Sequence, residues 1–172
     1  RFSRRFGPEA VHACGLFGQR EDGSWYDRFR GRLIFPIHNE SGKVIAFGGR
    51  ALRPGDEPKY LNSPETLAYK KSQVLYNLHR AKETIRKQDG SVLVEGYMDV
   101  IGVYSAGVHN VVATCGTALV ADQVRVLKRS SSNIVINFDG DSAGANATGR
   151  SVQILLEEGM HVRVLELEQG LD

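Results

Sequence analysis

Cysteine is scarce in this sequence, and the two that occur, Cys14 and Cys115, lie far apart with no CxxC pair. Neither a disulfide framework nor a zinc site is indicated, and we expect a reducing, cytoplasmic setting. The five histidines are scattered without metal-ligand spacing, which favours surface or packing roles. No run approaches the roughly 18 apolar residues of a membrane helix, and no apolar segment follows the charged start, so no signal peptide is indicated.

An initiating Met is also missing, and we interpret the chain as a fragment of a longer protein. Its 172 residues, 41% of them hydrophobic, suffice for one sizeable core or two small ones. Charge is uneven, with a net +7 over residues 1–90 and a net −5 over residues 91–172. This asymmetry suggests a polyanionic partner for the first half and cations for the second, although ordinary solvated faces would give the same counts.

Residues 91–172 alternate between β-branched runs and amphipathic stretches. We expect strands at 91–96, 110–116, 133–139 and 161–168, and helices at 97–107, 117–130 and 142–159. Strands separated by helices of this length indicate βαβ crossovers. This half is therefore predicted to be an α/β domain with a largely parallel sheet flanked by helices.

Residues 1–90 have a different pattern, that of a mixed α+β subdomain with a basic surface. The runs 31–39 and 43–52 flank "ESG" and predict a hairpin, in which Pro36 favours an edge strand or a bulge. Residues 55–66 contain two prolines and are predicted to be a loop, and residues 78–90 to be a helix. We place the domain boundary near residue 90.

Three carboxylates fall where predicted parallel strands end: Glu95 after "VLV", Asp139 after "VINF", and Asp141 two residues later. Ligands of α/β sheets bind at these ends. Residues i and i+2 of an extended chain point the same way, and the nearby glycines allow a ligand to approach closely. Clustered oxygen ligands without His or Cys favour a hard cation such as Mg²⁺ or Mn²⁺, which often serves phosphoryl transfer.

Two other interpretations of these carboxylates were weighed. Asp141 suits the N-cap of the following helix and Asp139 a turn, although capping does not require a third carboxylate at a neighbouring strand end. An aspartyl phosphatase of the haloacid dehalogenase type also carries DxD at a strand exit. That motif usually opens the first strand and continues with Thr or Val, whereas here it follows the third strand and "SAG" comes next.

The sequence resembles the bacterial DNA primase family, specifically its RNA polymerase core with a Toprim metal-binding domain. "LVEGYMDVIGVYSAG" and "FDGDSAG" are similar to the two acidic Toprim motifs, which topoisomerases share. "FPIHNESGKVIAFGGR" and "KYLNSPET" resemble the primase's own basic subdomain and are far more specific. The resemblance extends over nearly the whole chain, and it implies a 1–90 basic subdomain followed by a 91–172 Toprim domain.

The resemblance also implies a set of acidic site residues. Glu95 would be a metal ligand or proton-transfer group, and Asp139 and Asp141 would hold catalytic Mg²⁺ or Mn²⁺. Asp99 would be an auxiliary carboxylate, or simply a first-turn helix residue. Asp172 matches the first of a further acidic pair in the family. Since the second is missing here, we expect an incomplete metal site in this chain.

The basic residues that match family positions along a template and nucleotide groove are Arg28, Arg50, Lys59 and Lys71, with Tyr60 and Asn62 placed for stacking and polar contact. Arg30 and Arg32 form a possible extension of this strip, and Lys70 is a weaker candidate.

The implied activity is DNA-directed synthesis of RNA primers on single-stranded DNA from ribonucleoside triphosphates, a nucleotidyl transfer in replication. The family's zinc-binding module and its contacts with the replicative helicase and single-strand-binding protein would lie in regions outside this chain, and we expect the chain alone to be weakly active or inactive. Two alternatives remain: a topoisomerase-like cleaver, which needs a nucleophilic tyrosine, and a non-catalytic Toprim binding module.

Overall fold

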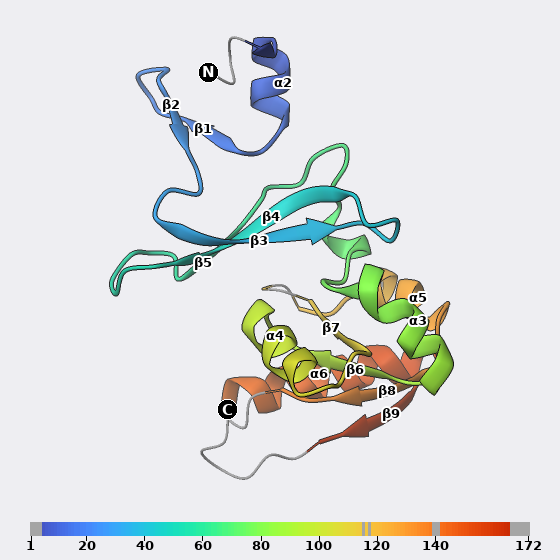
Figure 1. Cartoon of the computed structure of the whole chain (residues 1–172). Coiled ribbons are helices and arrows are strands. Elements are labelled where there is room, and N and C mark those ends of the chain that lie inside the picture. Colours follow the sequence, from blue (N-terminus) through green and yellow to red (C-terminus); the bar gives the residue numbers. More distant parts are fainter. Residues whose placement is uncertain (1–4, 115, 117, 139–141, 166–172) are drawn as a thin grey trace. The chain divides into compact units, whose positions relative to one another are not determined.

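The computed structural model describes residues 5–114, 116, 118–138 and 142–165. The chain divides into two compact units (Figure 1). The first comprises Arg1–Ile37 and Val44–Lys70, and the second comprises His38–Lys43 and Lys71–Asp172. No helix within the described ranges is long and apolar enough to cross a membrane.

The first unit contains a short helix and two small sheets. Helix α2 (Pro8–Ala13) precedes an antiparallel pair of strands, β1 (Phe17–Gln19) and β2 (Trp25–Asp27). Three further strands, β3 (Arg32–His38), β4 (Val44–Ala51) and β5 (Tyr60–Asn62), form a sheet in the order β3-β4-β5. Pro36 therefore lies in an edge strand, as predicted, where its missing N–H leaves no ladder bond unmade.

The prediction that residues 55–66 form a loop was wrong at its centre, because Tyr60–Asn62 is strand β5. It pairs antiparallel with β4, placing Arg50 opposite Tyr60 and Gly49 opposite Leu61. The two prolines flank this strand and remove no ladder donor from it. Three residues are too few for a sequence pattern to reveal, and the three-residue strands β1 and β2 escaped prediction for the same reason. The six-residue helix α2 was also not predicted.

The second unit is built on a four-stranded parallel sheet in the order β7-β6-β8-β9. Its strands are β6 (Ser91–Val94), β7 (Val111–Ala113), β8 (Asn133–Ile136) and β9 (His161–Val164). The helices are α3 (Leu78–Gln88), α4 (Tyr97–Ser105), α5 (Ala121–Lys128) and α6 (Ser142–Glu157), preceded by the 3₁₀ turn η1 (Lys71–Gln73). The predicted α/β architecture with a parallel sheet is confirmed.

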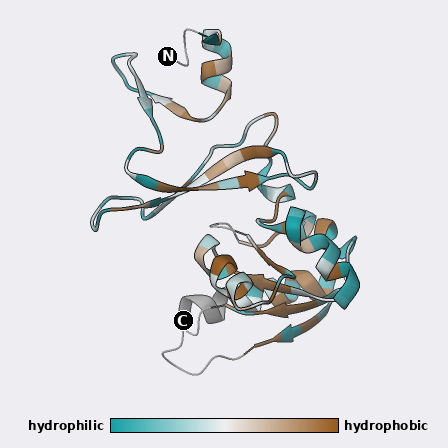
Figure 2. Ribbon diagram, viewed as in Figure 1, coloured by the Kyte–Doolittle hydropathy of each residue, from teal (hydrophilic) through white to brown (hydrophobic). Residues whose placement is uncertain are grey.

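Apolar residues fill both faces of this sheet (Figure 2). Leu93, Ile134 and Ile136 pack in one cluster with buried residues of α3, α5 and α6. Val94 and Val111 alternate with that set and are also fully buried, and α4 packs against β7. Burial on both faces explains why these strands are nearly continuous apolar runs in the sequence.

Helix α5 begins at Ala121, later than the predicted 117–130. Val120 has an extended backbone, with φ −127° and ψ 157°, and its N–H donates to Gln123 Oε1 at 3.2 Å. The Gln123 amide is fully buried and also donates to the carbonyls of Lys71 and Val74, at 3.0 Å each. This buried amide fixes the start of the helix, an effect that apolar periodicity does not encode.

Helix α3 packs within the second unit, where Leu78, Ala81 and Ile85 join its apolar core. The compact units therefore divide near Lys70 rather than at residue 90. A boundary near residue 90 stays a prediction for the limits of the inherited domains, which need not coincide with the division into packed units.

Candidate functional site

The carboxyl ends of the central parallel strands meet at one edge of the second unit's sheet. Strand β6 ends at Val94 and Glu95 follows at once, while β8 ends at Ile136. Leu93 aligns with Ile136, and the Asn137 N–H donates to the Leu93 carbonyl at 2.9 Å, which continues the pairing to the edge. Glu95 thus lies at the predicted position, at the ligand-binding edge of a parallel sheet.

The other predicted metal ligands, Asp139, Asp141 and Asp172, lie outside the described residues. Within the part of the chain that the structure describes, no three His, Cys, Asp or Glu side chains are grouped as a metal site. The metal set therefore stays a prediction, of which Glu95 is the one member that the structure places.

Asp99 has a helix-capping contact. Its Oδ2 accepts a hydrogen bond of 2.7 Å from the Gly96 N–H, at the start of α4. A carboxylate in the first turn also interacts favourably with the helix dipole. The geometry supports the simpler of the two roles considered for Asp99, and a role as an auxiliary carboxylate stays a prediction.

Asn137 is a polar residue at the same edge that the sequence analysis did not single out. Its Oδ1 is buried and has no hydrogen-bond partner among the residues that the structure describes. A buried amide oxygen without a donor is costly, and Asn137 directly follows the last residue of β8. The apolar pattern of "NIVINF" contained the signal, since Asn137 is the polar interruption just before the aspartates.

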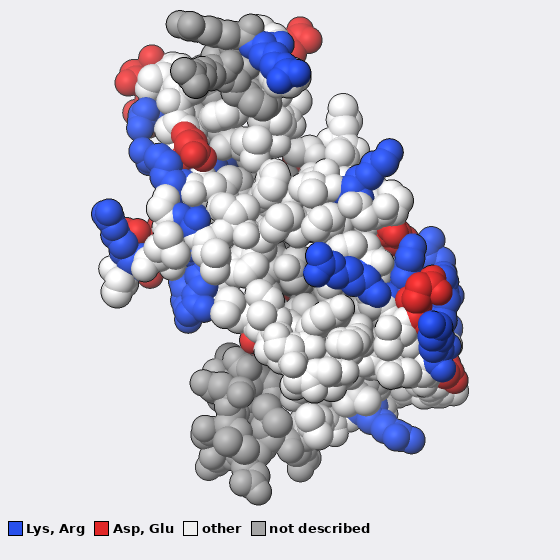
Figure 3. Space-filling view, viewed as in Figure 1, with Lys and Arg blue, Asp and Glu red and all other residues white. Residues whose placement is uncertain are grey.

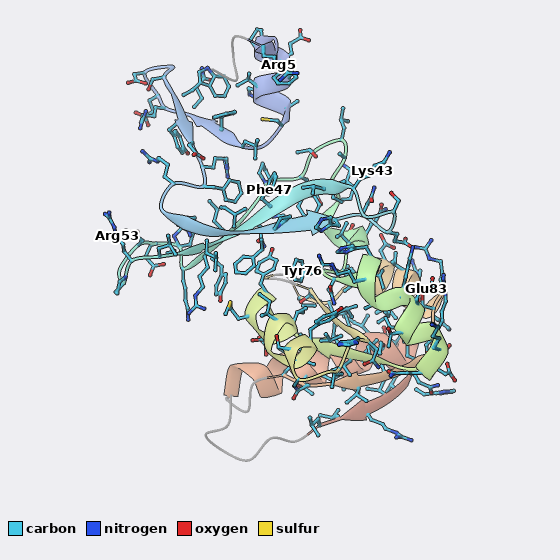
Figure 4. All side chains as sticks on the ribbon, in the orientation of Figure 1. Arg5, Lys43, Phe47, Arg53, Tyr76 and Glu83 are labelled. Atoms are coloured by element: carbon cyan, nitrogen blue, oxygen red, sulfur yellow. The ribbon has the colours of Figure 1, made fainter. Side chains whose placement is uncertain are left out.

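Both tyrosines near the acidic motif are packing residues. Tyr97 is 2% exposed and meets Tyr76 edge to face at 4.8 Å between ring centroids, and Figure 4 labels Tyr76. Tyr104 packs against His109 at 4.4 Å. A buried ring cannot present its hydroxyl to a nucleic-acid backbone, so this geometry does not favour Tyr97 as a strand-cleaving nucleophile.

In the first unit, the pairing of β4 with β5 brings together several predicted nucleic-acid contacts. Arg50 lies opposite Tyr60, and its guanidinium carbon is 5.8 Å from the centre of the Tyr60 ring, within cation–π range. Lys59 and Asn62 flank Tyr60 on the same segment, and Tyr60 is 38% exposed. A cation held beside an accessible ring matches the chemistry of single-strand binding.

Phe29, the residue after Arg28, packs beside β4. The Phe29 ring packs against Phe47 of β4 at 6.3 Å (Phe47 is labelled in Figure 4). A Cβ at Gly49 would lie 2.9 Å from Phe29 Cδ1, so Gly49 leaves the space that this ring fills. Arg28 Nε is buried, and no described residue forms a hydrogen bond with it.

The remaining basic candidates, Arg32 and Lys71, lie on different elements, β3 and η1. Arg32 Nη1 donates to the Pro58 carbonyl at 2.7 Å, so this guanidinium holds the β5 segment in place. Lys71 belongs to the second unit, in η1, where its carbonyl accepts from Gln123. Figure 3 shows Lys and Arg side chains gathered along one side of the first unit, over the β1–β2 hairpin and the adjoining ends of the β3–β5 sheet, with a few carboxylates between them.

Two family models match this chain in succession. Residues 2–82 match the N-terminal domain of the DNA primase catalytic core. Residues 92–172 match a Toprim-like domain. Together they account for both compact units.

Among characterised proteins, a DNA primase of Halalkalibacterium halodurans is 52% identical over 159 residues, which are 92% of this chain and 26% of that protein. The chain thus spans about a quarter of that relative's length. The Aquifex aeolicus primase, solved with its zinc-binding and RNA polymerase domains, superposes with a TM-score of 0.89 at 37% identity, covering 95% of this chain and 41% of that one. A DnaG primase catalytic domain bound to ssDNA gives 0.86 at 36% identity, covering 100% and 56%.

Proposed function

Because this chain belongs to the DNA primase catalytic-core family, we propose that it forms the polymerising part of an enzyme that synthesises RNA primers on single-stranded DNA. The observation that carries the proposal is the match of the chain along 95% of its length to a solved primase, with a TM-score of 0.89. The reaction is a nucleotidyl transfer, in which a 3′-hydroxyl attacks the α-phosphate of a ribonucleoside triphosphate and pyrophosphate leaves.

A Toprim-like domain within a primase core implies the use of a divalent metal ion. The described residues fit such an ion: the carboxylate of Glu95 and the buried, unpartnered oxygen of Asn137 lie at the edge where β6 and β8 end, and hard cations prefer oxygen ligands. We infer that Glu95, Asp139 and Asp141 hold Mg²⁺ or Mn²⁺, with Asp172 as a further ligand. When bound, the ion supplies Lewis-acid chemistry to phosphoryl transfer.

We propose that the nucleic acid is bound mainly by side chains of the first unit. Arg50 and Lys59 provide charges for phosphates, and Arg50 can contact one phosphate through two parallel hydrogen bonds. Tyr60 offers a ring on which a base stacks. Arg28 and Asn62 of the first unit, and Lys71 of the second unit, complete the proposed contact set. Phosphate contacts of this kind fix the position of the strand and carry little sequence information.

The proposed partners follow from this role. They are a single-stranded DNA template, ribonucleoside triphosphates and the RNA primer, in the bacterial cytoplasm at the replication fork. Support for the template comes from a relative at 36% identity whose structure contains ssDNA. We infer that contacts with a replicative helicase and a single-strand-binding protein are made by regions of the full-length protein outside this chain, and that a zinc-binding domain like that of the Aquifex aeolicus primase would also lie there.

Replacing Asp139 by Ala in the full-length protein tests the proposal. We expect primer synthesis to fall by at least about 10³-fold, because the metal site contributes several kcal/mol to phosphoryl transfer, while binding to a single-stranded oligonucleotide is kept. A protein that keeps synthesising primers after this change contradicts the proposal. If the unmodified protein synthesises no primers, and the Asp139→Ala variant binds DNA as well as the unmodified protein does, the protein is a Toprim binding module instead.

A further inference from the structure

The β1–β2 hairpin of the first unit presents an aromatic ring held against bare backbone. Tyr26 of β2 lies opposite Gly18 of β1, and a Cβ on Gly18 would come within 2.4 Å of Tyr26 Cζ. The outer end of the ring therefore occupies the space that a Cβ at position 18 would take, and any other residue there would displace it. This arrangement fixes the ring on one face of a two-stranded ribbon.

Two arginines are held by that ring. The guanidinium carbons of Arg20 and Arg30 lie 5.3 and 5.6 Å from its centroid, both within cation–π range. Arg20 also donates to Ser24 Oγ at 3.2 Å. Arg20 extends β1, whereas Arg30 follows β2 along the chain, so Tyr26 gathers two charges from separate segments.

Arg20 and Arg30 are both exposed. Within the described residues, neither forms a salt bridge with a carboxylate, whereas other exposed arginines such as Arg86 and Arg125 do. Two like charges that share one ring and lack a counter-ion repel each other. An anion bound between them would offset that repulsion.

The hairpin continues into the surface that carries Arg50. The Arg28 N–H donates to the Leu16 carbonyl at 3.0 Å, which extends the β1–β2 pairing. The next residue, Phe29, packs on Gly49, the neighbour of Arg50 in β4. The segment from Tyr26 to Arg30 therefore connects the β1–β2 hairpin with the surface that carries Arg50, and all of these residues belong to the first unit.

We propose that Arg20 and Arg30, positioned by Tyr26, form an additional phosphate-binding subsite for single-stranded nucleic acid beyond the Arg50–Tyr60 contacts. This inference rests on the proposed function, since it assigns a second segment of the same strand. The distances to the shared ring place the two guanidinium carbons at most about 11 Å apart, which is the rise of roughly three nucleotides along one strand. Short strands would end before this subsite, and longer ones would reach it.

The test compares two oligonucleotide lengths by fluorescence anisotropy with the 172-residue chain, using dye-labelled dT4 and dT12. For the double variant Arg20→Ala/Arg30→Ala we expect binding of dT12 to weaken about tenfold at low salt and binding of dT4 to change less than twofold. The slope of log K against log salt for dT12 should become shallower by about 1.4, because two phosphate contacts are lost.

Two further variants separate a subsite from general charge. Arg86→Ala/Lys87→Ala removes the same charge from α3 and should leave both oligonucleotides unaffected. Tyr26→Leu keeps both arginines but removes the ring, and it should produce a smaller loss for dT12 only. Circular dichroism at increasing temperature checks that each variant is folded.

If the Arg20→Ala/Arg30→Ala variant binds dT4 and dT12 more weakly by the same factor, the subsite proposal is overturned. The same holds if the α3 control loses as much affinity for dT12. Neither result affects the proposed function. If the double variant binds dT12 as tightly as the wild type, the subsite proposal is also overturned. Displacement of dT12 by polyglutamate at equal charge concentration shows a general anion surface and also overturns it. A wild-type chain that binds neither oligonucleotide contradicts both the subsite and the nucleic-acid role proposed for the first unit.

Discussion

The imidazole rings of His38 and His79 stack with 4.2 Å between their centroids and 27° between their planes. His38 ends β3 and His79 lies in the first turn of α3, and both belong to the second unit, so the stack attaches the His38–Lys43 turn to α3 within that unit. Nδ1 of each ring is buried and has no hydrogen-bond partner within the described part of the chain. Nearby, Lys82 Nζ donates to the Glu40 carbonyl at 2.8 Å and Arg129 pairs with the Glu40 carboxylate.

Acidification should loosen this attachment. Burial, together with the charges of His38, Arg80 and Lys82, lowers the pKa of His79 from 6.5 to about 4. The folded state therefore disfavours the protonated ring, and stability is fully present above the unfolded pKa and decreases as pH falls from 6.5 towards 4. Allowing for partial exposure to solvent, we expect His79 to account for a loss of about 1 kcal/mol between pH 7 and pH 5.

Urea unfolding of the chain at pH 7 and at pH 5 measures this effect. His79→Phe keeps a stacked ring and removes the titration, so its stability should change less between the two values than that of the wild type. His161→Phe is a control at an exposed histidine of β9. The account is contradicted if the wild type and His79→Phe lose the same stability.

Replacing Gly49 and Gly102 by alanine should change the free energy of unfolding in opposite directions. At Gly49 the new methyl would meet Phe29 Cδ1 at 2.9 Å and Arg32 Cδ at 3.1 Å, so we expect a destabilisation of about 1–3 kcal/mol. At Gly102, within α4, nothing lies within 4 Å of the new methyl, and higher helix propensity should stabilise by about 0.5–1 kcal/mol. Thermal unfolding of both variants checks the two signs, and a stabilising Gly49→Ala would refute the packing described for Phe29.

Gln123→Met should destabilise the second unit by about 2–4 kcal/mol. The substitution keeps the side-chain volume but leaves the carbonyls of Lys71 and Val74 without their buried donor. Gln153→Met, on the exposed side of α6, should change stability by less than about 0.5 kcal/mol. Chemical denaturation provides both values, and equal effects at the two positions would show that the buried amide is dispensable.

Arg50→Lys tests whether the geometry of this side chain matters beyond its charge. Lysine keeps one positive charge but has no planar fork for a phosphate and would stack less well on Tyr60. We expect binding of single-stranded DNA to weaken about threefold to tenfold, with the salt dependence nearly unchanged. Arg86→Lys on α3 should have no effect. If Arg50→Lys binds like the wild type, Arg50 acts as a simple point charge.

The second unit could be predicted from its sequence because its strands are buried on both faces. Nearly continuous apolar runs such as "NIVINF" predict central strands, and predicted helices of suitable length separate these strands in the sequence. The short strands β1, β2 and β5 could not be predicted, because three residues carry no period. The start of α5 depends on hydrogen bonds from Gln123 to residues about 50 positions away, which local patterns do not report.

The candidate site was predictable to a similar extent. Glu95 directly follows the apolar run Val92–Val94 and precedes Gly96, so its place at the sheet edge could be predicted directly. The pairing of Arg50 with Tyr60 could not, since it depends on the register between β4 and the unrecognised β5. Neither could Asn137, whose importance lies in an oxygen left without a donor after folding.

The most direct test of the central claim is an anomalous diffraction map of crystals of this chain soaked in Mn²⁺. The account predicts a peak at the carboxyl edge of the β6–β8 pair, beside Glu95 and in contact with the carboxylates of Asp139 and Asp141, at oxygen–metal distances of about 2.0–2.6 Å. The same soak of Asp139→Ala crystals should lose or weaken the peak. A map in which the ion binds elsewhere, for example at the His38–His79 pair, or in which no peak lies at that edge, would contradict the account.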